Sequence, residues 1–156
     1  MVRTGIGFDV HKLAGGRRLI LGGVEIDYPK GLLGHSDADV VCHAIADALL
    51  GAAGLGDIGL MFPDTDPAFK DISSLKILEA VASRITEAGH RINNIDVTII
   101  AQLPKVMPYA SSMKENLAKA LSTATEQVNI KGKTTETLGF IGREEGIATL
   151  AIATIE

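Results

Sequence analysis

The chain ends in GIATLAIATIE at residues 146–156, a segment that predicts a strand with no side suited to water. Alternate side chains of a strand point to opposite faces of the sheet. One face of this strand carries Leu150 and Ile152, and the other carries Ile147, Thr149, Ala151, Ala153 and Ile155. Because both faces are apolar, the segment indicates a sheet that is covered on both sides.

The cover on the two faces can come from two sources. Three helices can cover one face of such a sheet. In a chain of 156 residues, another subunit is the economical cover for the second face. We therefore predict a homo-oligomer. A strand buried on both faces within the monomer is the competing interpretation.

The remaining sequence alternates strand and helix patterns. Residues 17–27, RRLILGGVEID, predict a hairpin that turns at Gly22 and Gly23. Apolar residues recur at helical spacing in 36–53, 74–88 and 109–121, whereas 95–102 and 127–133 have strand patterns. The interleaving predicts an α/β fold, or two-layer α+β fold, with a mixed β-sheet and helices packed on one face. Residues 1–156 contain no repeat or linker, so we predict a single domain.

Composition excludes several classes of protein. The net charge is -4, and two tyrosines, four phenylalanines and no tryptophan leave little for base stacking, so we expect no nucleic-acid partner. Cys42 is the single cysteine, and we interpret it as a small buried hydrophobic residue. The N-terminus lacks the apolar core of a signal peptide, and no apolar run approaches the span of a bilayer. We therefore expect a reduced, cytoplasmic protein without a membrane partner.

A metal site is predicted by two short motifs. GIGFDVH at residues 5–11 places Asp9 and His11 at i and i+2 of a strand, so both side chains project from the same face. HSDADVVCHA at residues 35–44 supplies His43 from a predicted helix. Three nitrogen and oxygen ligands with an open fourth position are typical of catalytic zinc, whereas one cysteine excludes a thiolate cage.

A core histidine is the competing interpretation of His43, since an Asp-x-His pair with a distant histidine also occurs by chance. If residues 36–53 are helical, His43 shares a polar stripe that consists of Ser36, Asp39, His43 and Asp47. The opposing stripe is apolar and consists of Val41, Ile45, Ala48, Leu49 and Ala52. This arrangement favours a ligating imidazole with carboxylates around it.

Three loops have features suited to phosphates and bases. Residues 54–67, GLGDIGLMFPDTDP, predict a binding loop, and an ordinary turn whose aspartates cap helices is the alternative. Residues 131–146 combine Lys131 and Lys133 with hydroxyls and the carboxylate of Glu136, which suits phosphate oxygens and a bridging magnesium; a solvated charged loop is the alternative. Residues 101–108, AQLPKVMP, form a stiff wall against which a base can lie.

Five motifs in register give the chain a specific resemblance. They are GFDVH, KGLLGHSDADVVCHAIADALLGAAGLGDIG, FPDTDPAFK, DVTIIAQLPK and TTETLGFIGREEGIA, and together they cover nearly the whole chain. They resemble the 2-C-methyl-D-erythritol 2,4-cyclodiphosphate synthases of the non-mevalonate isoprenoid pathway. The resemblance implies a homotrimer with active sites at the subunit boundaries. It also implies a metal-dependent phosphorus–oxygen lyase that cyclises 4-diphosphocytidyl-2-C-methyl-D-erythritol 2-phosphate and releases cytidine monophosphate.

The resemblance also assigns roles to residues. It implies zinc at Asp9, His11 and His43, magnesium or manganese at Glu136, and catalytic roles for His35 and Thr134. In the family, 57–59 and 62–66 contact the methylerythritol phosphate end, 101–107 supply the cytidine pocket from the neighbouring subunit, and 133–136 contact the diphosphate. The implied substrate-binding residues are Asp9, Val10, His11, His35, Ser36, Asp57, Ile58, Gly59, Phe62, Pro63, Asp64, Thr65, Asp66, Ala101, Gln102, Leu103, Pro104, Lys105, Val106, Met107, Lys133, Thr134, Thr135, Glu136, Phe140 and Arg143.

One departure and two other function classes complete the prediction. Lys133 stands where the family pattern has a third threonine, and its charge still favours phosphate. A zinc-dependent phosphohydrolase would use the same three ligands to activate water. A nucleotide or isoprenoid-diphosphate binding module would keep the basic loop without needing the metal. The trimer axis, lined by Phe8, Arg143 and Glu145, is a hypothetical cavity for an isoprenoid diphosphate.

Overall fold

A computed structural model describes residues 1–63 and 65–156. Its main sheet has five strands in the order β4 (Lys30–Leu32), β1 (Arg3–Gly15), β7 (Gly146–Ile155), β5 (Ile92–Ile100) and β6 (Val128–Lys133). β1 pairs antiparallel with β4 and β7, and β7 pairs antiparallel with β5. β5 and β6 are parallel, so the sheet is mixed as predicted.

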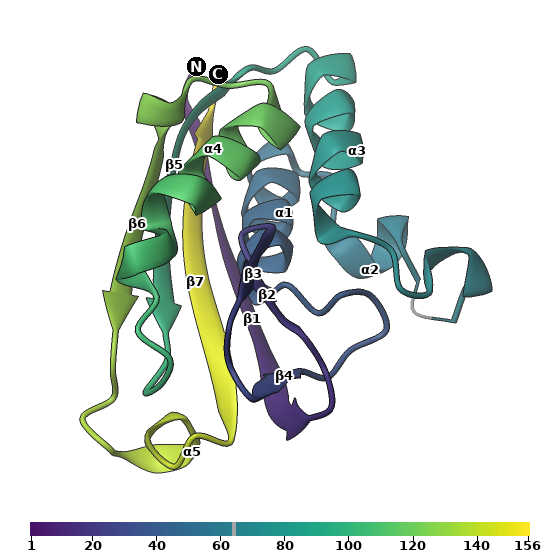
Figure 1. Cartoon of the computed structure of the whole chain (residues 1–156). Coiled ribbons are helices and arrows are strands. Elements are labelled where there is room, and N and C mark those ends of the chain that lie inside the picture. Colours follow the sequence, from purple (N-terminus) through teal and green to yellow (C-terminus); the bar gives the residue numbers. More distant parts are fainter. Residues whose placement is uncertain (64) are drawn as a thin grey trace.

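Three long helices pack on one face of this sheet (Figure 1). They are α1 (Val40–Ala53), α3 (Ser74–Glu87) and α4 (Ala110–Leu121). Short helical segments lie at α2 (Ile58–Met61) and α5 (Gly139–Gly142), with 3₁₀ turns at Pro67–Phe69, Met107–Tyr109 and Thr125–Gln127. Both termini lie together at one end of the sheet, and α5 lies at the other (Figure 1). None of the helices in the described part of the chain has the length and apolarity needed to span a membrane.

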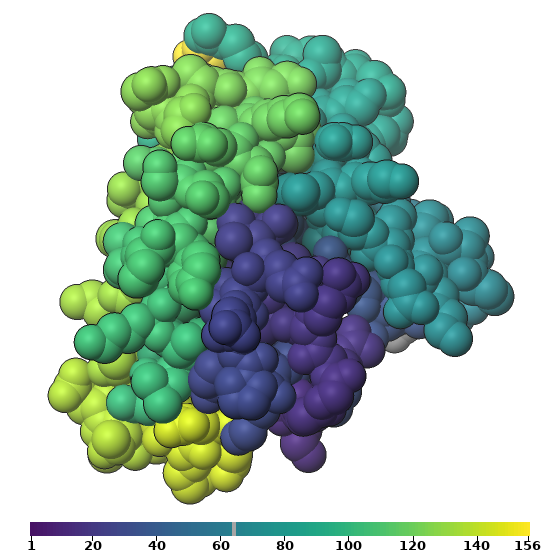
Figure 2. Space-filling model, in the orientation of Figure 1, coloured from purple at the N-terminus to yellow at the C-terminus, as the bar shows by residue number. Residues whose placement is uncertain are grey.

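A separate hairpin closes the helical side of the molecule. Its strands are β2 (Leu19–Leu21) and β3 (Val24–Ile26), joined by Gly22 and Gly23, both at positive φ. Positive φ at both turn residues suits glycine, as the sequence predicts for this hairpin. In Figure 2 the dark blue hairpin segment fills the face between the green α4 region and the teal α3 region.

The predicted elements are present, with shifted ends. α3 and α4 begin and end within one residue of the predicted limits, whereas β5 begins three residues before the expected 95. The helix predicted from 36 begins at Val40 because Asp39 is its N-cap. The sequence did not predict β4, α2 or α5.

The predicted polar stripe of α1 is wrong in part. Asp39 is fully buried, and Ser36 lies before the helix. The helix is buried on nearly all sides, because it lies between the sheet and α3, so its apolar residues do not form a single stripe. His43 and Asp47 nevertheless remain half-buried.

The second face of the sheet is open in the single chain. Ile6, Phe8, Val10 and Ile152 are 66%, 55%, 40% and 42% exposed, and all four belong to the face opposite the helices. A strand whose two faces are both buried within the monomer is therefore a wrong interpretation of 146–156. An apolar face of this kind calls for a partner surface.

Candidate functional site

Two glycines on β1 bring the strand against the backbone of α1. Gly5 and Gly7 share their face of the strand with Asp9 and His11. A Cβ atom on Gly5 would lie 2.0 Å from the carbonyl oxygen of Ala48, and one on Gly7 would lie 1.9 Å from that of Ala44. Only glycine permits this approach, which places His43, the residue before Ala44, beside Asp9. Sequence reasoning missed this role, although the spacing G-x-G-x-D-x-H carries its signal.

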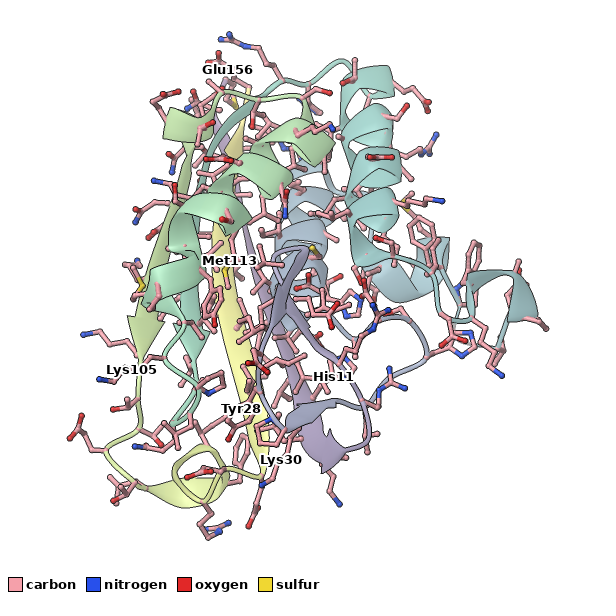
Figure 3. The ribbon with its side chains drawn as sticks, in the orientation of Figure 1. His11, Tyr28, Lys30, Lys105, Met113 and Glu156 are labelled. Atoms are coloured by element: carbon pink, nitrogen blue, oxygen red, sulfur yellow. The ribbon has the colours of Figure 1, made fainter. Side chains whose placement is uncertain are left out.

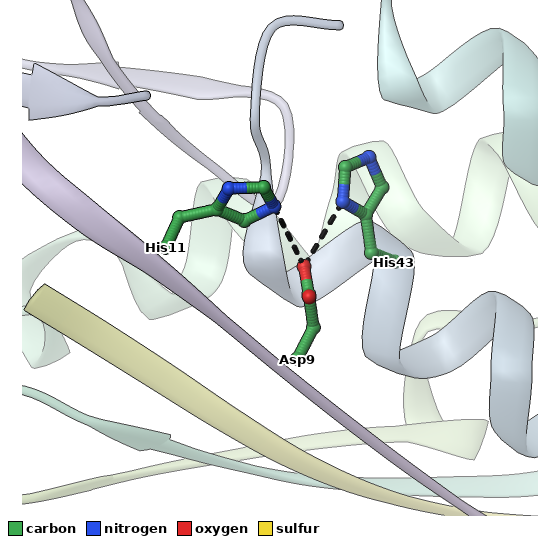
Figure 4. A group of neighbouring side chains, drawn as sticks. All are labelled: Asp9, His11 and His43. Carbon is green, nitrogen blue, oxygen red and sulfur yellow. Dashed lines mark hydrogen bonds and ion pairs between the residues drawn. The ribbon is translucent and has the colours of Figure 1, made fainter. Parts of the chain in front are cut away.

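Asp9, His11 and His43 converge as predicted (Figure 4). Asp9 Oδ2 lies 3.1 Å from His11 Nε2 and 3.0 Å from His43 Nδ1. One potential ligand atom from each of the three side chains lies within 4.8 Å of the other two. Strand β1 supplies two members of the cluster, and the first turn of α1 supplies the third.

The cluster favours a charged carboxylate. Burial opposes ionisation of Asp9, but the hydrogen bonds and charges of His11 and His43 outweigh it and hold the pKa of this carboxyl well below its usual value. Burial likewise disfavours charge on His11, but the hydrogen bond to Asp9 and its negative charge raise the pKa of His11. The ionised carboxylate of Asp9 therefore lies between two imidazole rings at a half-buried point.

The backbone at Leu33 and Gly34 orients the His11 ring. His11 Nδ1 is 2.5 Å from the carbonyl oxygen of Leu33. A carbonyl oxygen only accepts, so Nδ1 carries a hydrogen, and Nε2 is the nitrogen that faces Asp9. A Cβ atom on Gly34 would lie 3.0 Å from His11 Cε1, so Gly34 lets the backbone pass close to the ring. The sequence analysis did not identify Leu33 or Gly34.

These donors fit a divalent metal ion. Two imidazole nitrogens and one carboxylate oxygen, with no thiolate nearby, form a three-residue set that can leave a coordination position open. His11 also has the hydrogen bond on its outer nitrogen that metal-ligating histidines commonly make. The residues present therefore match the chemistry of a catalytic metal centre.

A cavity of about 500 Å³ opens beside the cluster. His11, His43, His35 and Ser36 line it, and His35 Nε2 lies 3.3 Å from the carbonyl oxygen of Asp66. The remaining predicted residues that line it are Ile58, Gly59, Phe62 and Pro63. The lining residues that the sequence analysis missed are Gly34, Phe69, Ile72 and Ile77. The cavity thus combines polar groups with an apolar wall.

Several predicted residues lie outside this cavity. Asp57 accepts from the backbone N–H of Leu60, and Asp66 from that of Ala68, so both cap short helical turns, in agreement with the alternative interpretation of the 54–67 loop. Thr65 is exposed, and Asp64 lies outside the described residues. Val10 projects from the opposite face of β1. Their substrate contacts stay predictions.

A second cavity of about 210 Å³ lies at the β5 and β6 side of the sheet. The predicted residues that line it are Ala101, Gln102, Pro104, Lys105, Val106, Met107, Lys133 and Thr134, joined by Pro108 and Gly132. Leu103 is 42% exposed and outside the lining. No residue lines both cavities in the described part of the chain, and β7 separates β1 from β5. Figure 3 shows His11 and Lys105 on different sides of β7.

The loop after β6 is tied to the second cavity. Thr134 Oγ1 donates to Glu136 Oε1 at 2.9 Å, and the backbone N–H of Thr137 donates to Gln102 Oε1 at 3.0 Å. Arg143 donates to Glu145 Oε1 at 2.8 Å. The predicted site residues of this loop that line neither cavity are Thr135, Glu136, Phe140 and Arg143. A single chain therefore does not bring catalytic candidates His35 and Thr134 together.

Comparison with known proteins shows the family of the chain. The YgbB family profile matches residues 2–156. The chain belongs to the YgbB family. Its relatives include proteins named 2-C-methyl-D-erythritol 2,4-cyclodiphosphate synthase. The one from Agathobacter rectalis is 62% identical over 99% of this chain and 87% of that protein. The one from Enterococcus faecalis is 56% identical over 100% of this chain and 99% of that protein.

Several solved structures have the same fold over nearly the whole of this chain. The bifunctional IspDF of Campylobacter jejuni matches 99% of this chain with a TM-score of 0.96 and 44% identity, and this chain spans 42% of that protein. A Plasmodium falciparum IspF described as a CDP complex matches 99% of this chain and 95% of its own length, with a TM-score of 0.87 and 34% identity. The family resemblance found in the sequence motifs is confirmed.

Proposed function

We propose that this chain converts 4-diphosphocytidyl-2-C-methyl-D-erythritol 2-phosphate into 2-C-methyl-D-erythritol 2,4-cyclodiphosphate and releases cytidine monophosphate. The observation that carries the proposal is the Asp9, His11 and His43 cluster beside a cavity that His35 and Ser36 line. The support from relatives is the name of the 62% identical Agathobacter rectalis protein. In this reaction the 2-phosphate attacks the β-phosphorus, and the bond from that phosphorus to cytidine monophosphate breaks.

Catalysis would rest on positioning and charge neutralisation. The second pKa of a phosphate monoester is about 6, so the attacking phosphate is mostly dianionic at neutral pH and needs no strong general base. Zinc at the Asp9 cluster, with magnesium or manganese at Glu136, would supply positive charge where two anionic groups must meet. His35 and Ser36 would donate hydrogen bonds to phosphate oxygens, and the Thr134 hydroxyl would orient the diphosphate from the second cavity.

The apolar wall of the first cavity favours cyclisation over hydrolysis. Ile58, Phe62, Phe69, Ile72 and Ile77 face this space. They can bury the methylerythritol carbon chain and exclude water. Since water would compete with the internal phosphate as a nucleophile, a dry wall supports the cyclase over the zinc-dependent phosphohydrolase.

The two cavities support a site shared between subunits. The first cavity would hold the methylerythritol end with its phosphates, and the second would hold cytidine from a neighbouring chain. β7 lies between the strands that border them, which favours a site built from two chains. The exposed apolar face formed by Ile6, Phe8 and Ile152 offers the contact surface, and we propose the homotrimer of the family as the assembly.

An isoprenoid diphosphate at the trimer axis remains part of the proposal. Phe8 is 55% exposed on the open face, and Arg143 and Glu145 are exposed at the α5 end of β7. An apolar ring and a guanidinium suit a prenyl chain and a diphosphate, respectively. Calorimetric titration with geranyl diphosphate tests this. Binding should be weaker in Phe8→Ala and in Arg143→Ala than in the wild type. Wild-type affinity in both variants would contradict the proposal.

Product analysis tests the reaction. Purified protein is incubated with the diphosphocytidyl phosphate substrate and magnesium, before and after zinc chelation, and followed by phosphorus NMR. Zinc-dependent appearance of a cyclic diphosphate together with cytidine monophosphate supports the proposal. Inorganic phosphate would instead indicate the hydrolase. Unchanged substrate that still binds would indicate a binding module.

A further inference from the structure

His43 has hydrogen-bonding partners on the side of its ring that faces away from Asp9. His43 Nε2 lies 3.0 Å from Ser74 Oγ and 3.1 Å from Ser36 Oγ. Ser74 is 0% exposed and Ser36 is 7% exposed. Ser74 is the first residue of α3, so a residue far along the chain reaches a member of the metal cluster.

Asp37 fixes the direction of the Ser74 hydroxyl. Ser74 Oγ donates to Asp37 Oδ1, and the backbone N–H of Ser74 donates to Asp37 Oδ2 at 3.0 Å. An ionised carboxylate accepts but does not donate. The single hydroxyl proton of Ser74 is therefore committed to Asp37, and Ser74 Oγ can only accept a hydrogen bond from His43.

This hydrogen-bond direction determines which ring nitrogen of His43 is free. If Ser74 accepts, His43 Nε2 carries a hydrogen, and Nδ1, which lies 3.0 Å from Asp9 Oδ2, is the nitrogen left for a metal ion. Ser36 Oγ, which already accepts from the backbone N–H of Ala38 at 3.1 Å, is compatible with the same arrangement. The opposite tautomer would leave Nδ1 unable to bind a metal ion.

We propose that Ser74 and Asp37 are positioning residues for His43, which hold its ring in the tautomer that ligates the metal through Nδ1. The inference rests on the metal centre of the proposed function. It adds a hydrogen-bonded path from the start of α3, through Ser74 and His43, to the ligand cluster. Neither residue lines the first cavity, so both act through His43 rather than on the substrate.

NMR of the wild-type protein tests the tautomer directly. Protein carrying ¹⁵N-labelled histidine is loaded with zinc, and long-range ¹H–¹⁵N correlations identify the protonated nitrogen of each ring. We expect His43 to be protonated at Nε2 and bound to zinc at Nδ1. Zinc bound at Nε2, with the hydrogen on Nδ1, would overturn the inference alone. Failure to bind zinc at all would overturn the metal centre as well.

Zinc affinity of variants tests the role of the two residues. Chelator competition at one fixed pH should show zinc binding weakened by about 10- to 100-fold in Ser74→Ala. Asp37→Asn should also weaken it, because an amide nitrogen would replace one of the two carboxylate oxygens that accept from Ser74. Ser73→Ala is the matched control, since Ser73 lies at the same helix end and its side chain makes no cap hydrogen bond among the described residues.

The outcomes separate a positioning role from a structural one. Wild-type zinc affinity in folded Ser74→Ala, or an equal loss in Ser73→Ala, would overturn the proposal. If circular dichroism shows that Ser74→Ala does not fold, the zinc affinity of Asp37→Asn and the His43 tautomer of the wild type decide whether the proposal stands. Weakened zinc binding together with a shift of the His43 hydrogen from Nε2 to Nδ1 supports it, because a general loosening of α3 would not by itself change the tautomer.

Discussion

At the scale of single residues, the outer nitrogens of two rings define the cluster. His11 Nδ1 is engaged by the Leu33 carbonyl oxygen, and His43 Nε2 by two serine hydroxyls. Each ring therefore turns its other nitrogen toward Asp9. Such preorganisation lowers the cost of binding a cation, because the ligands need little rearrangement.

His43→Ala should abolish stoichiometric zinc binding and lower turnover by at least about 100-fold while the protein stays folded. The physical reason is that His43 is one of the three proposed ligands but remains half-buried beside the cavity. Zinc content by mass spectrometry and cytidine monophosphate release measure the effect. His90→Ala is the control, since His90 follows α3 and lines a different groove. Unfolding of His43→Ala would indicate a core role.

The cluster of Asp9, His11 and His43 could be predicted from the sequence, but the residues that support it could not. Asp9 and His11 follow from the two-residue period of a strand, whereas His43 was singled out by a polar stripe that is only partly present. Gly34, Leu33 and Ser74 contact these rings through tertiary approach, which no local period encodes.

At the scale of elements, the contact between β1 and α1 positions the site. Gly7→Ala should destabilise the protein by about 3 kcal/mol and weaken zinc binding, because the new methyl group would overlap the carbonyl oxygen of Ala44 and push α1 away from Asp9. Urea unfolding and chelator competition measure the two effects. Gly15→Ala, whose Cβ would meet nothing within 4 Å, should change stability by less than about 0.5 kcal/mol. Equal effects of both substitutions would contradict this account.

Asp39 joins α1 to the β2–β3 hairpin. Its carboxylate accepts from the backbone N–H groups of Gly22, Gly23, Val41 and Cys42, at 2.9, 2.7, 3.1 and 3.2 Å. Asp39→Ala should therefore cost about 3 kcal/mol in the free energy of unfolding, since it removes a helix cap and leaves buried donors without an acceptor. Asp57→Ala, which removes an exposed cap, should cost about 1 kcal/mol or less. A similar loss in both variants would argue against the buried network.

Long periodic elements were predictable, and short ones were not. α3, α4 and the hairpin carry clear periods or turn residues, so the sequence locates them closely. β4, α2 and α5 span three or four residues, too few to show a period. The predicted start of α1 was too early because residues 36–39 continue the helical spacing. In the structure, the Asp39 side chain accepts from the first N–H groups of α1, so the helix begins at Val40.

At the scale of the whole molecule, the open sheet face predicts assembly. Ile152→Lys should produce monomers by light scattering and abolish cytidine monophosphate release, because a charge would enter an apolar interface and separate the two cavities. Leu60→Lys is the control for assembly, since Leu60 is 74% exposed on α2, away from the sheet. An Ile152→Lys protein that stays trimeric and active would contradict the assignment of this face.

Subunit complementation tests the central claim most directly, namely that the metal cavity of one chain works with the cytidine cavity of another. His43→Ala and Thr134→Ala, each inactive alone, are refolded together in equal amounts, and cytidine monophosphate release is measured. In the mixture, half of the chains have an intact metal cavity and the other half have an intact cytidine cavity. Random assembly therefore joins two intact cavities in about a quarter of the sites, and about a quarter of wild-type activity should return. No recovery in verified mixed trimers would contradict the claim and place the whole site within one chain.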